Sequence, residues 1–536
     1  MLVRLIIAMV LVFIYAMFKM KRSLHMLQQN LYNENNRYLR WVKKNIKEVF
    51  LNLDMFGILF TFCLEWSIAT YLSYYFLAIL VILYIVCIYN IKKNERLDQN
   101  KKPLVITSRV KRLIVTTVIL YLIPCVLGLI FNSYIGDLVI LLSIMAVFSF
   151  YVVFFAKVIN TPVERLVYKH YEKLAKKKLK SMENLKIIGI TGSYGKTSCK
   201  NILSTVLNSK FNTLPTPKSV NTFNGIMMTV NNNLTKFDDI FIAELGAYVK
   251  GEINRLCKLV NPKYGIITRI GTAHLETFGS EENIQSGKME LIEYLPSDGI
   301  GVLNRDDPKQ VNYEFKNEGH CRLLWVGIDT EDEVDVRATN IKCNSEGTTF
   351  DVYFKDDKKK YEFSTKLLGK HNVYNIISAL ALGRAFDIKV TDLQKAVRKI
   401  APVEHRLSMK SFPNFTFIDD AYNSNPVGAK SALEVLDMMK GYKVVVTPGM
   451  IELGDKEEFY NKEFGKQIAD VADKVILVGE EKTKPILAGL RDKEFNEDNI
   501  IIINDVTKAY EILGSMKEKK IYALFENDLP DTYNEK

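Results

Sequence analysis

The sequence predicts an α/β protein whose soluble part follows a membrane-embedded helical region. Three observations carry this prediction: uncharged apolar runs in the first 160 residues, short Ile/Val segments alternating with helical ones after residue 184, and a glycine-rich turn at residues 187–198. Alternating strands and helices are typical of a mostly parallel sheet covered by helices. With 536 residues, the chain has room for about three domains.

Residues 1–160 are expected to form a membrane region. Apolar runs nearly free of charge cover residues 2–18, 55–90, 113–131 and 138–155, and one membrane-spanning helix needs about 20 such residues. No small-residue cleavage site follows the first run, which argues against a secretory signal. We therefore expect a multi-pass protein of the cytoplasmic membrane.

Basic residues predict which side of the membrane each loop faces. Lys and Arg cluster in residues 19–54, 91–112 and 165–180, as is typical of cytoplasmic segments. The stretch 55–90 would then cross twice, with a turn near Tyr71–Tyr75, giving five spans; four spans with a re-entrant piece are the alternative. The net charge of +11 is due largely to these clusters, which favours anionic lipid as a partner and argues against nucleic acid.

The remaining chain divides into a linker and two domains. Residues 161–183 show apolar positions at helical spacing among lysines, which predicts an amphipathic linker helix. Residues 184–401 contain the strand-like segments KIIGI, DIFIAEL, YGIITRI and GIGVLN. Residues 402–536 contain a second series, FTFIDD, KVVVTP, KVILVG and NIIII, which predicts a separate Rossmann-like α/β domain.

The segment IIGITGSYGKTS at residues 187–198 is typical of a phosphate-binding loop. Gly192 and Gly195 would let backbone N–H groups approach phosphate oxygens. Lys196 adds a positive charge, and the Thr197 hydroxyl can bind Mg²⁺ at the start of the next helix. An incidental turn is the competing interpretation, but strand, glycines, lysine and threonine follow in the order that a phosphate site needs.

Further polar residues follow other predicted strands. Glu244 ends one strand, where a carboxylate is a natural Mg²⁺ ligand, and His274 follows another at the same edge. His274, His371 and His405 are three of only six histidines and lie in polar clusters, which favours function. Lys288 by itself is interpreted as a solvated helix lysine. The cysteines form no Cys-x-x-Cys pair, so we expect neither a zinc site nor a disulfide framework.

Two later segments carry amide, carboxylate and basic groups. LLGKHNVYN brings Asn372 to a helix start, where its amide could hydrogen-bond an adenine edge. EHRL and FIDDAYNSNP then supply a cation and polar groups near the join with the last domain: Arg406, Asp420, Tyr422, Asn423 and Asn425.

The order of these segments resembles the Mur ligase family, ATP-dependent amide-forming enzymes of peptidoglycan precursor synthesis. The branch that adds D-alanyl-D-alanine is the most similar, through GTAHLETFGSEENI, LPSDGIGVLNRDDP, LGKHNVYN, DDAYNSNP and MIELGDKEE, and TGSYGKTS has the family's short loop. The resemblance covers residues 184 to about 480. It implies a central ATPase domain at 184–401 and a C-terminal ligase domain at 402–536.

The resemblance also implies a mechanism and residue roles. An acceptor carboxylate attacks the γ-phosphate of ATP, and an amine then displaces phosphate from the acyl phosphate. The implied catalytic residues are Lys196, His274 and Lys288. Those implied to bind ATP are Gly192, Ser193, Gly195, Lys196, Thr197, Ser198, Asn372, Arg406 and Asp420. Two Mg²⁺ ions would be held by Thr197, Glu244, His274 and Lys288, the last as a carbamate. The substrate would be contacted by Asn221, Asn224, Tyr422, Asn423 and Asn425.

Departures from the family pattern leave the acceptor and the amine open. Membrane spans stand where family members have a soluble domain that grips uridine, which favours a lipid-linked glycopeptide or another membrane-proximal carboxylate as acceptor. A membrane-bound poly-γ-glutamate synthetase is a second interpretation, and an inactive ATP-binding scaffold a third. Intact Lys196, Glu244 and Lys288 argue against the scaffold. The amine, an amino acid or dipeptide, stays undetermined.

Overall fold

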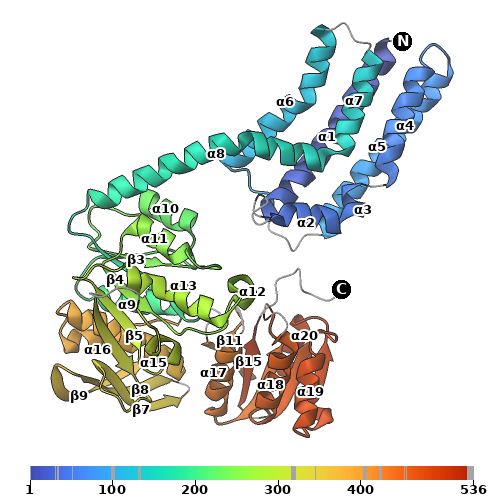
Figure 1. The fold of residues 1–536 in the computed structure, drawn as a ribbon. Coiled ribbons are helices and arrows are strands. Elements are labelled where there is room, and N and C mark those ends of the chain that lie inside the picture. Colours follow the sequence, from blue (N-terminus) through green and yellow to red (C-terminus); the bar gives the residue numbers. More distant parts are fainter. Residues whose placement is uncertain are drawn as a thin grey trace. The chain divides into compact units, whose positions relative to one another are not determined.

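The computed structural model describes residues 2–30, 32, 36–50, 52–97, 103–130, 135–315, 321–344, 346–402, 407–421, 425–451, 453, 456–518 and 520–527. The chain separates into two compact units, Met1–His170 and Tyr171–Lys536 (Figure 1). Among the described residues, the first contains only helices and the second contains both helices and strands. This division confirms the predicted order of a helical region followed by α/β structure.

Among the residues that the structure describes, two helices of this unit, α1 and α5, are long and apolar enough to cross a membrane. A third candidate arises if α7 and α8, bent by 84° at the break between them, count as one span. The expected total of four or five spans stays a prediction. The helices are α1 (Leu2–Gln29), α2 (Arg37–Lys44), α3 (Ile46–Val49), α4 (Asn52–Trp66), α5 (Leu72–Leu97), α6 (Ser108–Ile130), α7 (Ile135–Val147) and α8 (Ser149–Lys180).

The stretch 55–90 forms two helices, α4 and α5, which pack as a hairpin (Figure 1). The turn between them lies at residues 67–71, whereas the sequence predicts it near Tyr71–Tyr75. Hydroxyl groups bond backbone carbonyls in the observed turn, Ser67 Oγ to Cys63 over 2.7 Å and Thr70 Oγ1 to Ser67 over 2.8 Å, whereas residues 72–75 already belong to α5.

The amphipathic linker is the second half of a longer helix. We expect it to begin at Thr161, but α8 begins at Ser149 and continues through this point. The side chains of Asn160 and Thr161 bond carbonyls one turn earlier, Asn160 Nδ2 to Ala156 over 2.9 Å and Thr161 Oγ1 to Lys157 over 2.9 Å. These polar residues therefore do not break the helix.

A buried polar cluster joins α1 to α4. Lys19 and Asp54 form an ion pair, and Tyr15 Oη donates to Asp54 Oδ1 over 2.5 Å. None of the three residues is more than 1% exposed. A buried charge is costly unless it is paired and hydrogen-bonded, so the cluster fixes these two helices against each other.

The second unit begins with a nine-stranded sheet of order β2-β3-β1-β4-β5-β6-β7-β8-β9. The strands from β2 to β7 pair in parallel, and β7, β8 and β9 are antiparallel. The four predicted strands are present as β1, β3, β4 and β5. The strands are β1 (Lys186–Thr191), β2 (Thr213–Pro215), β3 (Ile240–Glu244), β4 (Tyr264–Ile267), β5 (Ile300–Asn304), β6 (Arg322–Gly327), β7 (Val336–Asn344), β8 (Gly347–Phe354) and β9 (Asp357–Thr365).

Helices cover both faces of this sheet (Figure 1). On one face, α9 and α15 share a core with Ile188 and Ile190 of β1. On the other face, Leu291 of α13 lies over Gly189 and Gly265, where added methyl groups would approach its side chain to 2.8 and 3.1 Å. The helices are α9 (Lys196–Leu207), α10 (Phe223–Asn232), α11 (Glu252–Val260), α12 (Leu275–Phe278), α13 (Glu281–Tyr294), α14 (Pro308–Val311), α15 (Lys370–Ala385) and α16 (Val390–Arg398).

The register of the sheet decides where the predicted site residues meet. Ile190 of β1 pairs with Glu244 of β3 and with Ile266 of β4. Because these strands are parallel, the loops after Thr191, Glu244 and Ile267 leave from one edge of the sheet. The glycine loop, Glu244 and His274 therefore lie at the same edge of the sheet.

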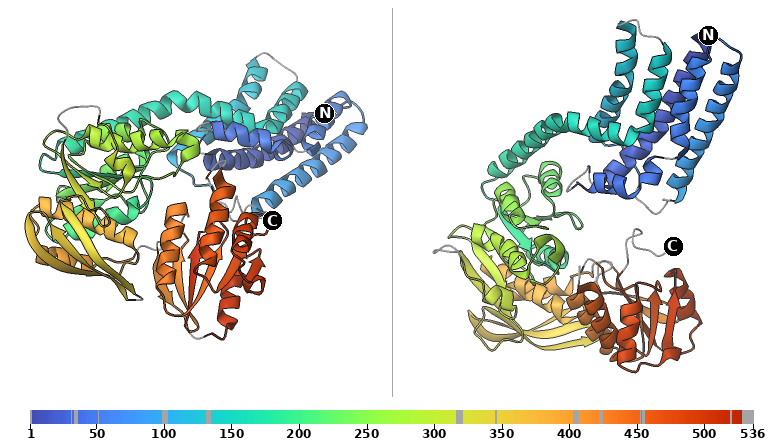
Figure 2. Two further views of the ribbon diagram at one scale, coloured as in Figure 1. Left: turned by 60° about the horizontal axis from the view of Figure 1, so that its bottom comes forward. Right: turned by 45° about the vertical axis from the view of Figure 1, so that its right-hand side comes forward.

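The last domain has a six-stranded sheet of order β10-β11-β15-β12-β13-β14, in which only β10 is antiparallel to its neighbour. One face packs on α17, α18 and α19 and the other on α20 (Figure 2). Its elements are β10 (Ser408–Ser411), β11 (Phe415–Asp420), α17 (Pro426–Asp437), β12 (Tyr442–Thr447), α18 (Glu457–Ala469), β13 (Lys474–Val478), α19 (Lys484–Asp492), the 3₁₀ turn Glu497–Asn499, β14 (Ile500–Ile503), α20 (Thr507–Ser515) and β15 (Ile521–Glu526).

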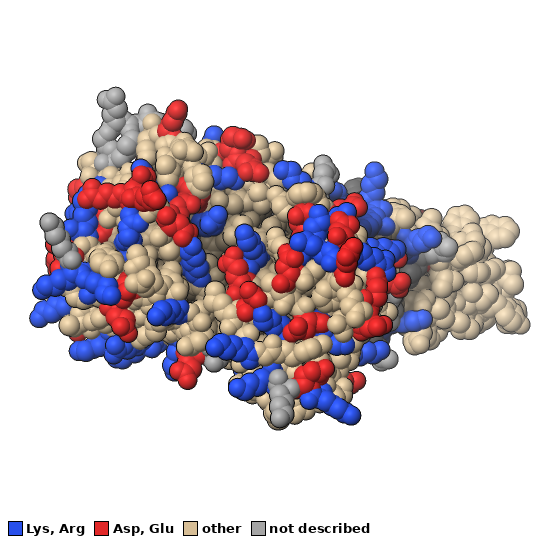
Figure 3. All heavy atoms as spheres, turned by 90° about the horizontal axis from the view of Figure 1, so that it is seen from below, with Lys and Arg blue, Asp and Glu red and all other residues tan. Residues whose placement is uncertain are grey.

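Charged side chains of both signs are interspersed on the face drawn in Figure 3. A nucleic-acid-binding protein would instead gather Lys and Arg into a patch or stripe. No such patch stands out on this face, and the expectation that nucleic acid is not a partner stays a prediction.

Candidate active site

The glycine loop has the conformation that its sequence predicts. It leaves β1 at Thr191, and Gly192 and Gly195 adopt φ values of 148° and 80°, which favour glycine. A Cβ on Gly192 would lie 2.0 Å from Thr268 Oγ1. The loop therefore needs glycine here both for its backbone angle and for its contact with the loop after β4.

Lys196 is the first residue of α9, directly after the loop. Its Nζ donates to the carbonyl oxygens of Gly192 over 2.8 Å and of Ser193 over 3.2 Å. The Ser193 hydroxyl donates in turn to the Gly271 carbonyl over 3.2 Å. A helix N-terminus with a cationic side chain folded over its own loop is the arrangement that receives phosphate groups.

A second loop, residues 268–271, supports the first. The backbone N–H of Ser193 donates to the Arg269 carbonyl over 2.9 Å, and Thr268 Oγ1 donates to the Tyr194 carbonyl over 2.6 Å. Buried Asp307 accepts from the N–H of Ile270 over 2.8 Å. Sequence reasoning did not single out Thr268 or Asp307, although Asp307 lies in the segment LPSDGIGVLNRDDP, because both side chains act on backbone groups.

Glu244 lies at the centre of a buried polar cluster next to the loop. Its Oε1 accepts from Thr197 Oγ1 over 3.1 Å and from Asn221 Nδ2 over 3.2 Å, and its Oε2 accepts from Lys200 Nζ over 3.1 Å. Glu244 and Lys200 are 1% and 0% exposed. The structure thus brings together three predicted residues, Thr197, Asn221 and Glu244, and adds Lys200, which the sequence could have suggested because it lies one turn after Lys196 on the same helix face.

His274 and Lys288 lie within electrostatic reach of Lys196. His274 precedes α12 with φ 61° and contacts the Tyr248 ring, with ring centroids 4.5 Å apart. Burial, together with the charges of Lys196 and Lys288, lowers the pKa of His274 to about 4. The imidazole is therefore neutral at neutral pH, as a metal ligand must be.

Lys288 is not a solvated helix lysine, as its sequence alone suggests, because it is only 1% exposed. Its Nζ donates to the Ala247 carbonyl over 3.1 Å and lies 5.1 Å from the centroid of the Phe278 ring. Burial and the charge of Lys196 lower its pKa to about 7. A neutral amine is thus accessible at this position near physiological pH.

A hydroxyl and a carboxylate beside the glycine loop could serve as oxygen ligands for a cation. No group of three or more His, Cys, Asp and Glu side chains is placed to hold a metal ion in the part of the chain that the structure describes. The hydroxyl of Thr197 and the carboxylate of Glu244 do face each other beside the loop. These hard oxygen donors fit Mg²⁺, which uses few protein ligands and takes the others from phosphate and water.

Asn372 lies on the wall of a cavity of about 300 Å³ next to α9. The cavity is also lined by Ser198 and Ile202 of α9, by Leu367, and by Pro402. Asn372 is 5% exposed, and its Nδ2 donates to the Leu368 carbonyl over 2.8 Å, so its Oδ1 can be held in a fixed direction. Asn372 therefore lines a cavity beside α9, and its contact with an adenine base stays a prediction.

The predicted residues of the last domain are placed only in part. Arg406, Tyr422 and Asn423 lie outside the described residues. Asp420 ends β11, and its Oδ1 accepts from the Leu407 N–H over 3.2 Å. The Asn425 side chain caps α17 by accepting from the Gly428 N–H over 2.9 Å.

Asn224, the remaining predicted substrate residue, is exposed in the first turn of α10, three residues after Asn221. The structure therefore does not bring Asn224 into the cluster around Glu244. It presents this amide to solvent instead.

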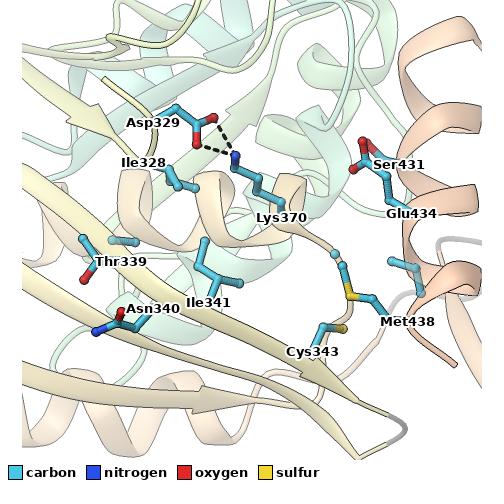
Figure 4. A pocket seen from close by; sticks show the side chains of 13 residues that line it. Ile328, Asp329, Thr339, Asn340, Ile341, Cys343, Lys370, Ser431, Glu434 and Met438 are labelled. Carbon is cyan, nitrogen blue, oxygen red and sulfur yellow. Dashed lines mark hydrogen bonds and ion pairs between the residues drawn. The ribbon is translucent and has the colours of Figure 1, made fainter. Parts of the chain in front are cut away.

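Figure 4 shows a second cavity, of about 470 Å³. It is lined by Ile341 and Cys343 of β7, by Glu434 and Met438, and by Lys370, which pairs with Asp329 over 2.5 Å. The residues that line this cavity do not include any of the predicted site residues. The larger cavity is thus separate from the polar cluster that could perform chemistry.

Comparisons with known proteins identify the domains that carry these residues. The profile of the Mur ligase middle domain matches residues 190–383, and that of the Mur ligase glutamate ligase domain matches residues 405–525. The UDP-N-acetylmuramoyl-tripeptide--D-alanyl-D-alanine ligase of Bacillus subtilis is 32% identical over 351 residues, 65% of this chain and 73% of that protein. The Escherichia coli ligase of the same name is 31% identical over 298 residues, 55% of this chain and 65% of that protein.

Solved structures give the same answer for the fold. A crystal structure of MurF from Acinetobacter baumannii has a TM-score of 0.60 at 25% identity, covering 67% of this chain and 77% of that one. MurF from Thermotoga maritima, solved in complex with ADP, has a TM-score of 0.58 at 25% identity and covers 67% and 80%. The matched domains contain the glycine loop, Glu244, His274 and Lys288. This chain belongs to the Mur ligase family of ATP-dependent acid–amino acid ligases.

Proposed function

We propose that this protein is a membrane-bound ligase that uses ATP to join D-alanyl-D-alanine, or a related amine, to a carboxylate of a peptidoglycan precursor. The observation that carries the proposal is the cluster in which Thr197, Glu244 and Lys200 lie directly behind the glycine loop. The likeness to D-alanyl-D-alanine ligases over 351 residues supports the choice of substrates. The reaction would proceed through an acyl phosphate.

The residues of the glycine loop would bind ATP. The loop amides and Lys196 would hold the phosphates, with the base in the cavity beside Asn372 and Ser198. Asp420 and Arg406 would approach the ribose and phosphates from the last domain. Because phosphoryl transfer needs mostly positioning and charge neutralisation, a rigid loop supported by buried Asp307 suits this task.

Thr197, Glu244, His274 and Lys288 would hold two Mg²⁺ ions, which neutralise phosphate charge when bound. Lys288 would serve as a carbamate, formed when its neutral amine attacks CO₂ and loses a proton. Burial of Lys288 and its lowered pKa support this modification, since only an unprotonated amine reacts. The neutral imidazole of His274 is suited to ligation for the same electrostatic reason.

The acceptor is proposed to be lipid-linked. Neither family profile extends before residue 190, and the preceding helical unit contains α1 and α5, which are long and apolar enough to span a bilayer. An enzyme held in the membrane would meet an acceptor on a polyprenyl carrier without releasing it into water. Asn221, which bonds Glu244, would orient the acceptor carboxylate towards the phosphates.

The test is a reconstitution of the full chain in lipid nanodiscs with ATP, Mg²⁺ and D-alanyl-D-alanine. The acceptor is either UDP-N-acetylmuramoyl-tripeptide or its undecaprenyl-linked form, and both phosphate and ligated product are measured. We expect product with the lipid-linked acceptor, and none with Lys196→Met. Turnover with the UDP form alone would refute the lipid-linked acceptor, and product formation by Lys196→Met would refute the site.

A further inference from the structure

Lys200 is a buried cation for which the proposed reaction has no step. It lies in α9, one turn after Lys196, and is 0% exposed. Its Nζ donates to Glu244 Oε2 over 3.1 Å and also to the backbone carbonyl of Lys218. A lysine is rarely buried to this extent, and when it is, its charge must be compensated.

The two carboxylate oxygens of Glu244 have different surroundings. Oε1 accepts from the Thr197 hydroxyl and the Asn221 amide, 3.1 and 3.2 Å away. Both are neutral groups, and the hydroxyl is itself a cation ligand. Oε2 accepts from the Lys200 ammonium, so it already has a full positive charge as its partner.

We propose that Lys200 is a positioning residue that occupies Oε2 of Glu244, so that the carboxylate offers only Oε1 to a divalent cation and the site thereby favours Mg²⁺ over Ca²⁺. The inference rests on the proposed function, because it takes Glu244 as a metal ligand. Mg²⁺ requires near-octahedral geometry with short bonds, which single carboxylate oxygens satisfy, whereas the larger Ca²⁺ is commonly held by both oxygens of one carboxylate. An ammonium fixed on Oε2 excludes the second mode.

The bond from Lys200 to Lys218 extends this role to the loop that carries Asn221. Lys218 has a positive φ of 48°, and the N–H of Val220 donates to the Pro217 carbonyl over 3.0 Å, so the chain turns tightly here. Asn221 follows directly and reaches Glu244 Oε1. One ammonium thus holds the carboxylate and the turn that supplies its other hydrogen-bond donor.

The experiment measures cation preference by thermal unfolding, without turnover. Full-length protein in detergent micelles is mixed with ADP and titrated with Mg²⁺ or Ca²⁺, and the rise in melting temperature gives the half-saturating concentration of each. Lys200→Met keeps the length of the side chain but removes its charge and donors. Changes of residues that orient metal ligands typically alter metal affinity by about 10- to 100-fold, so we expect the preference for Mg²⁺ over Ca²⁺ to fall at least about tenfold.

Two further variants make the result decisive. Lys200→Gln retains a donor without a charge and should fall between the wild type and Lys200→Met. Lys210→Met is the matched control, because Lys210 also donates to backbone carbonyls, those of Phe386 and Asp387 over 2.8 and 3.1 Å, but does not contact Glu244. It should lower the melting temperature without changing the cation ratio.

A cation ratio that stays within about twofold of the wild type in both Lys200 variants would overturn the inference. So would a wild-type protein that ADP with Mg²⁺ does not stabilise, a result that would also overturn the metal site. If the cation ratio shifts as expected but no amide forms with any acceptor, the substrate assignment fails and the role of Lys200 stands.

Discussion

Replacing Gly192 by alanine should disable the glycine loop. Gly192 has φ 148°, and a Cβ there would lie 2.0 Å from Thr268 Oγ1 and 3.2 Å from the backbone carbonyl carbon of Thr268. A residue other than glycine in this region of backbone space costs about 1–3 kcal/mol. The clash comes in addition, and Thr268 cannot yield freely because its hydroxyl donates to Tyr194 over 2.6 Å.

The expected result is a moderate loss of stability and a larger loss of ATP use. For a domain of this size, 1 kcal/mol lowers the melting temperature by about 2–4 °C, so the backbone cost alone should lower the melting temperature of Gly192→Ala by about 2–12 °C. The loop can relieve the clash only by moving its amides, and each 1.4 kcal/mol of lost interaction is tenfold in rate. We therefore expect kcat/KM for ATP to fall at least about tenfold.

Gly251→Ala is the matched control. Gly251 also has a positive φ, 93°, but a Cβ there meets nothing within 4 Å. It should therefore show the backbone cost without the effect on ATP. The reasoning is refuted if the two variants have the same kcat/KM for ATP, or if Gly192→Ala binds ADP as tightly as the wild type in a calorimetric titration.

Three further predictions concern buried groups. Burial and the charge of Lys196 lower the pKa of Lys288 to about 7, so below pH 7 the folded protein holds a buried charge. This cost to stability declines as the pH rises from 7 towards the pKa of a lysine in the unfolded chain. In CO₂-free buffer Lys288→Met should therefore stabilise the protein by up to about 5 kcal/mol at pH 6 and by less at pH 9, and the opposite order in urea unfolding would contradict this. Asp307→Ala removes the acceptor of the Ile270 N–H and should cost about 1–3 kcal/mol with a higher KM for ATP; unchanged unfolding would count against its supporting role. Asn425→Ala removes a helix cap and should cost about 1 kcal/mol of stability. Asn425→Ser keeps a capping oxygen and should retain both stability and turnover. If Asn425→Ser is as stable as the wild type but has lost turnover, Asn425 contacts the substrate instead.

The strands that carry the site could be predicted because they are buried on both faces. The segments at Ile187–Ile190 and Ile240–Ala243 are nearly continuous apolar runs, the pattern of central parallel strands. The antiparallel strands β7 to β9 were not predicted, and β9 shows the reason most clearly. The segment DKKKYEFST of β9 is rich in lysine, and among those of its residues whose burial the structure describes only Phe363 and Thr365 are buried, so its strand character depends on pairing with β8 and not on its own composition.

The sequence predicts those parts of the site whose geometry is fixed by a backbone motif. It does not predict the residues whose protonation depends on burial. The order Gly192, Gly195, Lys196, Thr197 places the loop and the first helical turn without knowledge of the fold. By contrast, Lys288 is indistinguishable in sequence from a surface lysine, because only the packing of α13 under Ala247 and Phe278 removes it from water.

The buried ion pair between Lys19 and Asp54 has a consequence for biogenesis. The two residues are separated by 35 positions, so during synthesis the ammonium of α1 emerges well before the carboxylate of α4 that neutralises it. Until Asp54 is present, burying this part of α1 in an apolar environment leaves the Lys19 ammonium unpaired, which is energetically costly. The first helix therefore cannot be transferred by itself without a penalty: grafted alone onto a foreign enzyme, it would carry an unmatched lysine, because the carboxylate that pairs with Lys19 lies on α4.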